Sequence, residues 1–189
     1  MKNTAIALAA LFTLTTAQAQ AATYAIDPTH TFVTFEVDHF GTSTNRGRFD
    51  RKEGIIEFDR AGKTGRVDIT LQTASINTGV APFEAHLKSK DFFNAADFPT
   101  ARFASERLVF NGDKVSEVVG NLTLLGKTLP VTLKANLFNC YNSPMLKREV
   151  CGGDFETTID RTQWGMSTYV PAGQRAPVRL LIQVEAVRQ

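Results

Sequence analysis

Alternation of apolar and polar side chains with a period of two recurs along this chain and constrains its fold more than any other feature. Between residues 31 and 37, Val33, Phe35 and Val37 fall on one face and polar side chains fall on the other. This pattern predicts a half-buried β-strand. Four further segments, 67–72, 129–136, 155–160 and 178–185, repeat it.

Three noisier segments, 46–59, 101–110 and 115–124, bring the expected number of strands to about eight. In the first of them Phe49 faces inward, and Gly54 is predicted to mark a β-bulge that shifts the phase before Ile56 and Phe58. Turn signals at residues 60–63, 111–113 and 125–127 indicate short connections, which favour antiparallel neighbours.

Eight antiparallel strands with one apolar face each predict an all-β fold, an up-and-down barrel without exposed edges. A two-sheet sandwich is the alternative. A barrel of this size is either filled by its own side chains or holds one elongated ligand, and both arrangements require the same inward apolar faces. The pattern alone therefore leaves this choice open.

One aromatic segment interrupts the strands. Five of the fourteen phenylalanines lie between Phe83 and Phe103, and residues 82–93 do not alternate. We expect a short helix or a pair of turns here. Such an insert in an all-strand chain is expected to close the end of the barrel, over either a packed core or a ligand cavity.

The N-terminal residues resemble a secretion signal. Lys2 precedes an apolar run over residues 5–14, which is too short to span a bilayer, and two Ala-x-Ala patterns follow. We expect a signal peptide over residues 1–21, cleaved after Ala19 or Ala21, and a single exported domain over residues 22–189. The expected location is the periplasm or the medium, with no membrane-spanning segment in the mature chain.

The charge balance and the two cysteines further limit the functions that this chain can have. The 21 Lys and Arg residues nearly balance the 19 Asp and Glu residues without a basic block, so nucleic-acid binding is not expected. Cys140 and Cys151 are the two cysteines, and an oxidising compartment favours a disulfide between them. Closing this short loop stabilises a fold by about 3 kcal/mol in the chain-entropy model.

Chemistry-bearing motifs are sparse. His30, His39 and His86 lack the spacing of a compact metal site, so no metal or cofactor is predicted. Asp160 and Arg161 follow a strand, where charged groups are usually solvated or paired. Trp164 follows them and could either line a pocket entrance or pack the barrel end. No catalytic residue is assigned.

An ordered set of short blocks spans the chain after the signal segment. The blocks are Tyr24 to His30, Val33 to His39, Gly47 to Phe49, His86 to Phe93, Phe98 with Pro99, Gly120 to Lys127, and Asp160–Arg161 with Trp164–Gly165. Together they resemble the YceI-like family of exported bacterial lipid-binding proteins. Small departures are Thr31, where the family often has Ser, and Trp164, where it often has Phe.

The resemblance implies a lipocalin-like barrel that holds a long isoprenoid, either a polyprenyl chain or the tail of a ubiquinone-type quinone. It also implies a membrane b-type cytochrome as a conceivable partner. An isoprenoid has almost no hydrogen-bonding groups, so apolar walls with a few polar groups at the mouth suit it. The expected wall residues are Val33, Phe35, Val37, Phe49, Ile69, Leu71, Phe103, Leu122, Val131 and Leu133, with Phe83, Leu87, Phe92 and Phe93 from the insert, Trp164 at the entrance, and His39 and Arg161 at the headgroup end.

Two other functions remain open at the sequence level. A barrel filled by its own side chains would have a structural or surface-interaction role. An enzyme acting on an isoprenoid lipid is the second alternative, with His39 and Asp160 as its acid–base candidates.

Overall fold

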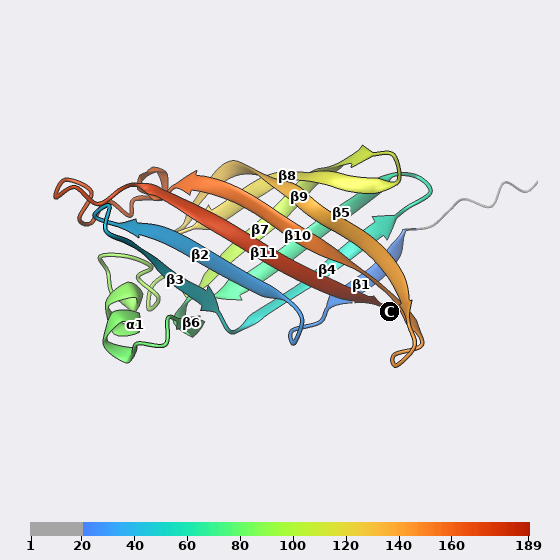
Figure 1. The fold of residues 1–189 in the computed structure, drawn as a ribbon, viewed down its shortest axis with the longest axis horizontal. Helices are drawn as coiled ribbons and strands as arrows, with labels where there is room; N and C mark the ends of the chain where they lie inside the picture. The colour runs from blue at the N-terminus through green and yellow to red at the C-terminus, as the bar shows by residue number, and fades with distance from the viewer. Residues whose placement is uncertain (1–20) are drawn as a thin grey trace, which may run out of the picture.

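The computed structural model describes residues 21–189, so the expected signal peptide lies outside the described residues except for Ala21. The described chain is almost entirely β-structure with one short α-helix (Figure 1). The strands are β1 (Ala22–Ile26), β2 (Phe32–His39), β3 (Ser43–Phe49), β4 (Lys52–Asp59), β5 (Thr64–Gln72), β6 (Ile76–Asn77), β7 (Thr100–Asn111), β8 (Lys114–Leu124), β9 (Lys127–Ser143), β10 (Arg148–Asp160) and β11 (Pro177–Arg188). The helices are α1 (Ala81–Lys88) and the 3-10 helices η1 (Thr73–Ser75) and η2 (Arg161–Trp164).

Eight strands form a closed antiparallel ring. The order is β1, β4, β5, β7, β8, β9, β10 and β11, and β11 pairs back with β1. From β7 onward each strand pairs with the next one in sequence. Short hairpin turns join β7 to β8, β8 to β9 and β9 to β10, whereas residues 161–176, which include η2, connect β10 to β11. The predicted eight-stranded up-and-down barrel is therefore confirmed, and the two-sheet alternative is not adopted.

Two of the eight strands in the ring continue, after a bend, into a further strand: β1 is continued by β2, and β4 by β3. One half of β11 pairs with β2 through Val178–Gln183, and its end pairs with β1 at Ala186–Arg188. On the other side, β3 pairs with β2 and β4 pairs with β1. β1 with β2, and β3 with β4, thus act as two long strands that bend where the pairing stops.

The prediction of a β-bulge at Gly54 was wrong. β4 pairs with β5 in an unbroken register, including Gly54 opposite Ile69. The phase instead changes earlier, at Asp50 and Arg51, where the chain leaves the sheet between β3 and β4. Gly54 has a packing reason: a Cβ atom there would lie 2.3 Å from Cδ1 of Ile69, so the missing side chain makes room for that residue.

Aromatic rings and the disulfide lie together at one end of the barrel. The Phe58 ring lies 6.2 Å from that of Phe110 and 5.7 Å from that of Phe138, and Tyr24 packs against Phe58 edge-on. Cys140 and Cys151 are direct cross-strand partners on the β9–β10 hairpin, with Cα atoms 4.1 Å apart. The predicted disulfide is confirmed, and it joins two paired strands. We call this the closed end.

The aromatic insert lies at the opposite end, where α1 is followed by turns up to residue 98 (Figure 1). Pro82 stands in the first turn of the helix, where its missing N–H costs nothing. The carboxylate of Glu84 accepts hydrogen bonds from the backbone N–H groups of Thr78 (2.9 Å) and Gly79 (3.1 Å), which precede the helix. The predicted helical insert is therefore present.

Candidate ligand-binding cavity

The interior of the barrel is a cavity of about 510 Å³ lined mostly by apolar side chains. This volume lies within the range of small-molecule sites. Ile69, Leu71, Phe103 and Leu133 line it and are half-buried although their strands turn them inward. The inward faces therefore do not fill the barrel, which resolves the choice that the sequence left open.

The predicted site residues gather on the wall of this cavity. All of them except Trp164 line it: Val33, Phe35, Val37, His39, Phe49, Ile69, Leu71, Phe83, Leu87, Phe92, Phe93, Phe103, Leu122, Val131, Leu133 and Arg161. They come from β2, β3, β5, β7, β8, β9, the insert and η2. Contact of each with a ligand stays a prediction.

Trp164 packs the barrel end and does not line the cavity. It is buried in a cluster with Leu124, Ile159 and Met166, and its indole N–H donates to the carbonyl oxygen of Leu122 at 3.2 Å. The sequence allowed Trp164 either to line a pocket entrance or to pack the barrel end, and the structure shows that it packs the barrel end. A buried indole needs a partner for its N–H, and the β8 backbone supplies it.

Other wall residues were not predicted. The inward face of β11 contributes Val178, Leu180, Ile182 and Val184, and the alternation of that segment was a sufficient signal for all four. Phe40, Tyr169 and Gln174 come from connections between elements. No periodic pattern points to residues in loops, so the sequence offered no signal for them.

The mouth of the cavity is marked by the lining residues that are exposed, His39, Phe40 and Tyr169. Phe40 and Tyr169 adopt left-handed backbone conformations, with φ values of 55° and 63°. Such values are unfavourable for bulky residues and cluster at functional sites. The two rings thus stand on strained turns at the entrance.

The insert and the loop over residues 165–176 meet across this entrance. The Phe92 ring lies 5.0 Å from that of His86 and 6.3 Å from that of Tyr169. Thr168 donates its hydroxyl to the carbonyl oxygen of Asp91 at 2.8 Å. Phe93 of the insert packs edge-on against Phe49 of the barrel wall at 5.4 Å. The insert therefore covers a cavity rather than a packed core.

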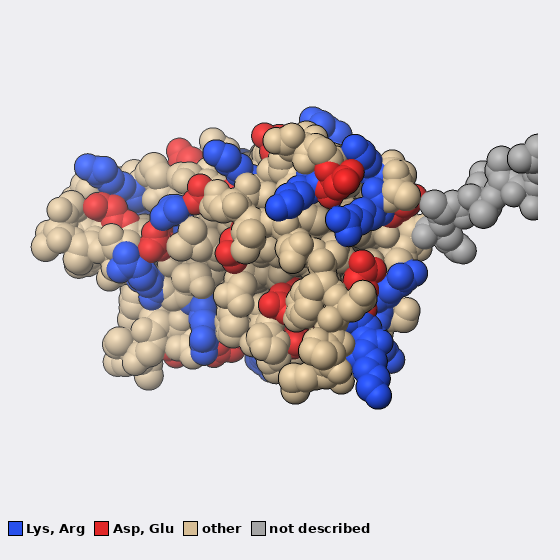
Figure 2. Space-filling view, turned by 45° about the vertical axis from the view of Figure 1, so that its right-hand side comes forward, with Lys and Arg blue, Asp and Glu red and all other residues tan. Residues whose placement is uncertain are grey.

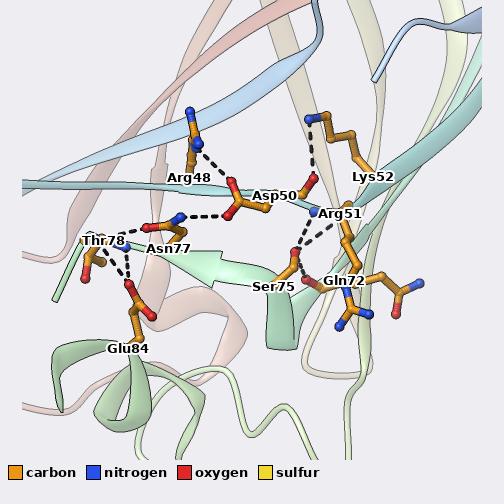
Figure 3. Close-up of polar contacts among 10 residues, drawn as sticks. Arg48, Asp50, Arg51, Lys52, Gln72, Ser75, Asn77, Thr78 and Glu84 are labelled. Carbon is orange, nitrogen blue, oxygen red and sulfur yellow. Dashed lines mark hydrogen bonds and ion pairs between the residues drawn. The ribbon is translucent and has the colours of Figure 1, made fainter. Parts of the chain in front are cut away.

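Polar contacts attach the start of the insert to the bend between β3 and β4 (Figure 3). Asp50 accepts hydrogen bonds from Nδ2 of Asn77 (2.7 Å) and Nε of Arg48 (2.8 Å). These bonds, with that from Asn77 foremost, hold the pKa of the Asp50 carboxyl below its usual value. On the other side, Ser75 accepts a hydrogen bond from the backbone N–H of Arg51 at 2.9 Å. The insert is thus tied to the barrel wall at its origin.

Arg161 is buried at the mouth, with 4% of its surface exposed. Nη1 donates to the carbonyl oxygen of Met166 at 3.1 Å, and Nη2 donates to that of Thr168 at 3.0 Å and to Oε1 of Gln174 at 3.1 Å. Burial lowers the pKa of the guanidinium, and the Asp160 charge partly opposes this. The guanidinium carbon lies 5.9 Å from the centre of the Phe92 ring. Arg161 thus connects η2, the 165–176 loop and the insert.

The polar group at the closed end is of a different kind. The Tyr24 hydroxyl donates to Oε2 of Glu149 at 2.9 Å, and Arg188 lies 3.5 Å from the same carboxylate. Burial, assisted by the contact with Glu149, raises the pKa of Tyr24 to about 12. The phenol is therefore neutral over the physiological range and satisfied by protein, so it offers a ligand little.

The acid–base pair of the enzyme alternative does not assemble on the cavity wall. His39 lines the mouth, whereas Asp160 is not among the lining residues. Asp160 instead accepts hydrogen bonds from the backbone N–H and the hydroxyl of Thr162, at 2.9 and 2.6 Å, and so begins η2. These bonds lower the pKa of its carboxyl, as expected of a helix cap and not of a proton donor.

Metal-binding geometry within residues 21–189 occurs at one cluster, Cys140, Glu149 and Cys151. Both sulfur atoms of that cluster belong to the disulfide, so they do not act as thiolate ligands. The three histidines do not contribute to it.

On the face drawn in Figure 2, acidic and basic side chains are interspersed. Arg179 bridges Glu36 and Glu156 across neighbouring strands, and Arg46 pairs with Glu36 at 2.8 Å. This mixed pattern differs from the single-sign stripe typical of nucleic-acid binding. No helix within residues 21–189 is long and apolar enough to cross a membrane.

A closed antiparallel barrel with an apolar cavity open at one end defines a lipocalin-like binding fold. A family model described as "YceI-like domain" matches residues 24–186. The chain therefore belongs to the YceI-like family, as the sequence blocks indicated.

Relatives and solved structures agree with this assignment. A UPF0312 protein of Pseudomonas paraeruginosa is 39% identical, with all of both chains covered, and the protein YceI of Salmonella arizonae is 37% identical over 93% of this chain and 92% of its own. BcnA of Burkholderia cenocepacia has the same fold, with a TM-score of 0.71, 22% identity and coverage of 85% of this chain and 98% of its own. A polyisoprenoid binding domain from Saccharophagus degradans superposes with a TM-score of 0.61 at 15% identity, covering 90% of this chain and all of that domain.

Proposed function

We propose that this protein binds and carries a long isoprenoid lipid, a polyprenyl chain or a ubiquinone-type quinone, with the apolar tail inside the barrel. The observation that carries the proposal is the unfilled apolar cavity of about 510 Å³ that runs between the aromatic closed end and the mouth. A structural barrel would gain stability by filling this space, because voids cost contacts.

The physical chemistry of the wall suits such a ligand. Each Å² of apolar surface removed from water contributes about 25 cal/mol, so a methyl-branched chain binds without specific polar contacts. The polar lining residues other than Tyr24 and Thr31 gather toward the mouth: His39, Asn45, His86, Arg161, Tyr169 and Gln174. A tail in the barrel with its headgroup at the mouth matches this division.

The comparisons support the ligand class indirectly. The Saccharophagus degradans domain is described as polyisoprenoid binding, and it shares the fold of this chain. Its identity of 15% is too low to transfer a ligand by itself, so the cavity carries the argument.

The proposed place of action is the periplasm, which agrees with the disulfide and with the expected signal peptide. Binding, not catalysis, is the proposed activity, and it requires no cofactor or metal. A membrane b-type cytochrome as partner remains a hypothesis that rests on the family resemblance alone.

The test is native mass spectrometry of the protein purified from its own periplasm, followed by organic extraction of any bound lipid. We expect an isoprenoid at near one molecule per chain, and added ubiquinone should raise the melting temperature of delipidated protein. If extraction yields no lipid and ubiquinone leaves the melting temperature unchanged, the carrier function is wrong.

A substitution that fills the cavity localises the site. Leu133→Trp places a larger side chain on the wall at mid-barrel, and we expect it to lower isoprenoid affinity at least about tenfold by excluding part of the tail. Thr132→Trp is the matched control, because the neighbouring side chain is exposed on the outer face of β9. Equal affinities of the two variants would place the lipid outside the barrel.

A further inference from the structure

Arg161 stands out among the residues that line the cavity because of its charge. The lining residues include no Asp, Glu or Lys, and Arg161 is the one permanently charged side chain among them within residues 21–189. A cation on an apolar wall is costly unless an opposite charge or several acceptors compensate it. The wall thus presents a single positive charge that has hydrogen-bond acceptors but no carboxylate partner within residues 21–189.

The protein partners of Arg161 are all neutral oxygen atoms. Two are backbone carbonyls, of Met166 and Thr168, and the third is the side-chain amide of Gln174. Its neighbour Asp160 directs its carboxylate to Thr162. Within the described chain no carboxylate lies within ion-pair distance of this guanidinium.

One donor of Arg161 is unsatisfied. Its Nε atom is buried and has no hydrogen-bond partner in the described part of the chain. Leaving a buried donor of a charged group unpaired is unfavourable, so native structures rarely keep one without a functional reason. An acceptor from outside the protein would satisfy it.

The position of Arg161 fits the end of a ligand whose tail lies in the barrel. It follows β10, lies over the Phe92 ring of the insert and donates a hydrogen bond to Thr168 in the loop that carries Tyr169. We infer that Arg161 is the binding site for an anionic headgroup, so that the preferred ligand is an isoprenoid carrying a phosphate or carboxylate rather than a neutral alcohol. This inference rests on the proposed function, since it assigns the headgroup of the same lipid.

The experiment compares two probes with the same twenty-carbon tail, geranylgeranyl phosphate and geranylgeraniol, by calorimetric titration of delipidated wild-type protein. A charge-assisted hydrogen bond to the phosphate should make it bind about ten- to a hundredfold more tightly than the alcohol. This comparison needs no variant. If both probes bind equally, the inference is wrong and the carrier function stands; if neither probe binds, both are wrong.

Variants then assign the preference to Arg161. Arg161→Gln should bring the two affinities to within about threefold of each other, because it removes the charge and leaves the apolar wall intact. Arg161→Lys should retain part of the preference, because the ammonium keeps the charge without the planar fork. The matched control is Arg175→Gln at the same rim, where the side chain is 73% exposed and lies 3.9 Å from Asp38.

A purely structural Arg161 would give a different result. If it served only to hold the 165–176 loop, Arg161→Gln would weaken the phosphate and the alcohol by the same factor. That outcome overturns the inference, as does a preference that Arg175→Gln abolishes and Arg161→Gln preserves.

Discussion

The two ends of this barrel are built from different structural elements. At the closed end, paired strands continue to the rim and are joined by the Cys140–Cys151 disulfide, and interlocking rings around Phe58 fill the interior. At the mouth, a helix, turns and a long loop replace strand pairing, and polar groups line the wall. The closed end is expected to supply stability, whereas the mouth accepts the ligand.

This difference has a physical origin. Strand pairing satisfies backbone groups and brings apolar faces together, so it is rigid and leaves little room for entry. Loops held by a few side-chain contacts can open at small cost, and binding residues are therefore often carried on loops over a stable scaffold. Substitutions at the two ends should consequently affect different properties.

The largest expected effect is on stability at the closed end. Phe58→Ala removes the ring that packs against both Phe110 and Phe138 and should destabilise the fold by about 3–5 kcal/mol in urea denaturation. Ile55→Ala on the same strand is the matched control, because Ile55 is exposed and should change stability by less than about 1 kcal/mol. Similar losses for both variants would show that the aromatic cluster does not stabilise this end.

Replacing the disulfide is expected to have a slightly smaller effect. The double variant Cys140→Ser/Cys151→Ser should lose about 3 kcal/mol of unfolding free energy, because without the disulfide the unfolded chain gains conformational entropy. Affinity for an isoprenoid should stay within about twofold of wild type, since of the two cysteines only Cys151 lines the cavity and serine has nearly the same volume. A large loss of affinity without a loss of stability would contradict the division between the two ends.

The smallest expected effect on stability belongs to the polar contacts that attach the insert to the barrel wall. Asn77→Ala removes the hydrogen bond to Asp50 and a second one, 2.9 Å long, from the backbone N–H of Gly79, and should cost about 1 kcal/mol. Amide hydrogen exchange should accelerate in α1, while β9 and β10 exchange as before. Asn139→Ala, on an exposed position of β9, is the matched control.

The same variant has a predictable pH dependence. The bond from Asn77, and after it that from Arg48, lowers the folded-state pKa of Asp50. Its contribution is therefore present above the ordinary Asp pKa of about 3.9 and is lost as the pH falls through the lower folded value. Asn77→Ala should consequently lose less stability than wild type between neutral pH and the acid range. If the unfolding free energy of the variant falls as steeply as that of wild type below about pH 4, the Asp50 carboxylate is not stabilised by this contact.

Period-two patterning predicted the barrel because it records which face of each strand avoids water. It therefore also identified wall residues such as Phe35, Ile69 and Leu133, since inward residues face the interior whether it is filled or hollow. The same logic failed at Gly54, where the residue type was read as a bulge. There the glycine instead accommodates the Ile69 side chain on the neighbouring strand, a contact between distant residues that no local pattern contains.

The mouth was less predictable than the wall. Tyr169 and Gln174 reach the cavity from a loop, and Trp164 turns away from it because the β8 backbone offers its indole a partner. Loop residues carry no periodicity, so their direction depends on the contacts that form after the strands have paired.

The sequence by itself predicted antiparallel strands that favour a barrel, a disulfide, and an aromatic helix or pair of turns over one end, because each of these follows from local spacing and residue type. The structure decided for the barrel over the two-sheet sandwich and for the helix. The tertiary structure alone decided that the barrel is hollow and that Arg161, which lines the cavity, has one buried donor without a partner in the described part of the chain. Volume and unsatisfied hydrogen bonds are properties of side chains from many strands considered together, and no single segment encodes them.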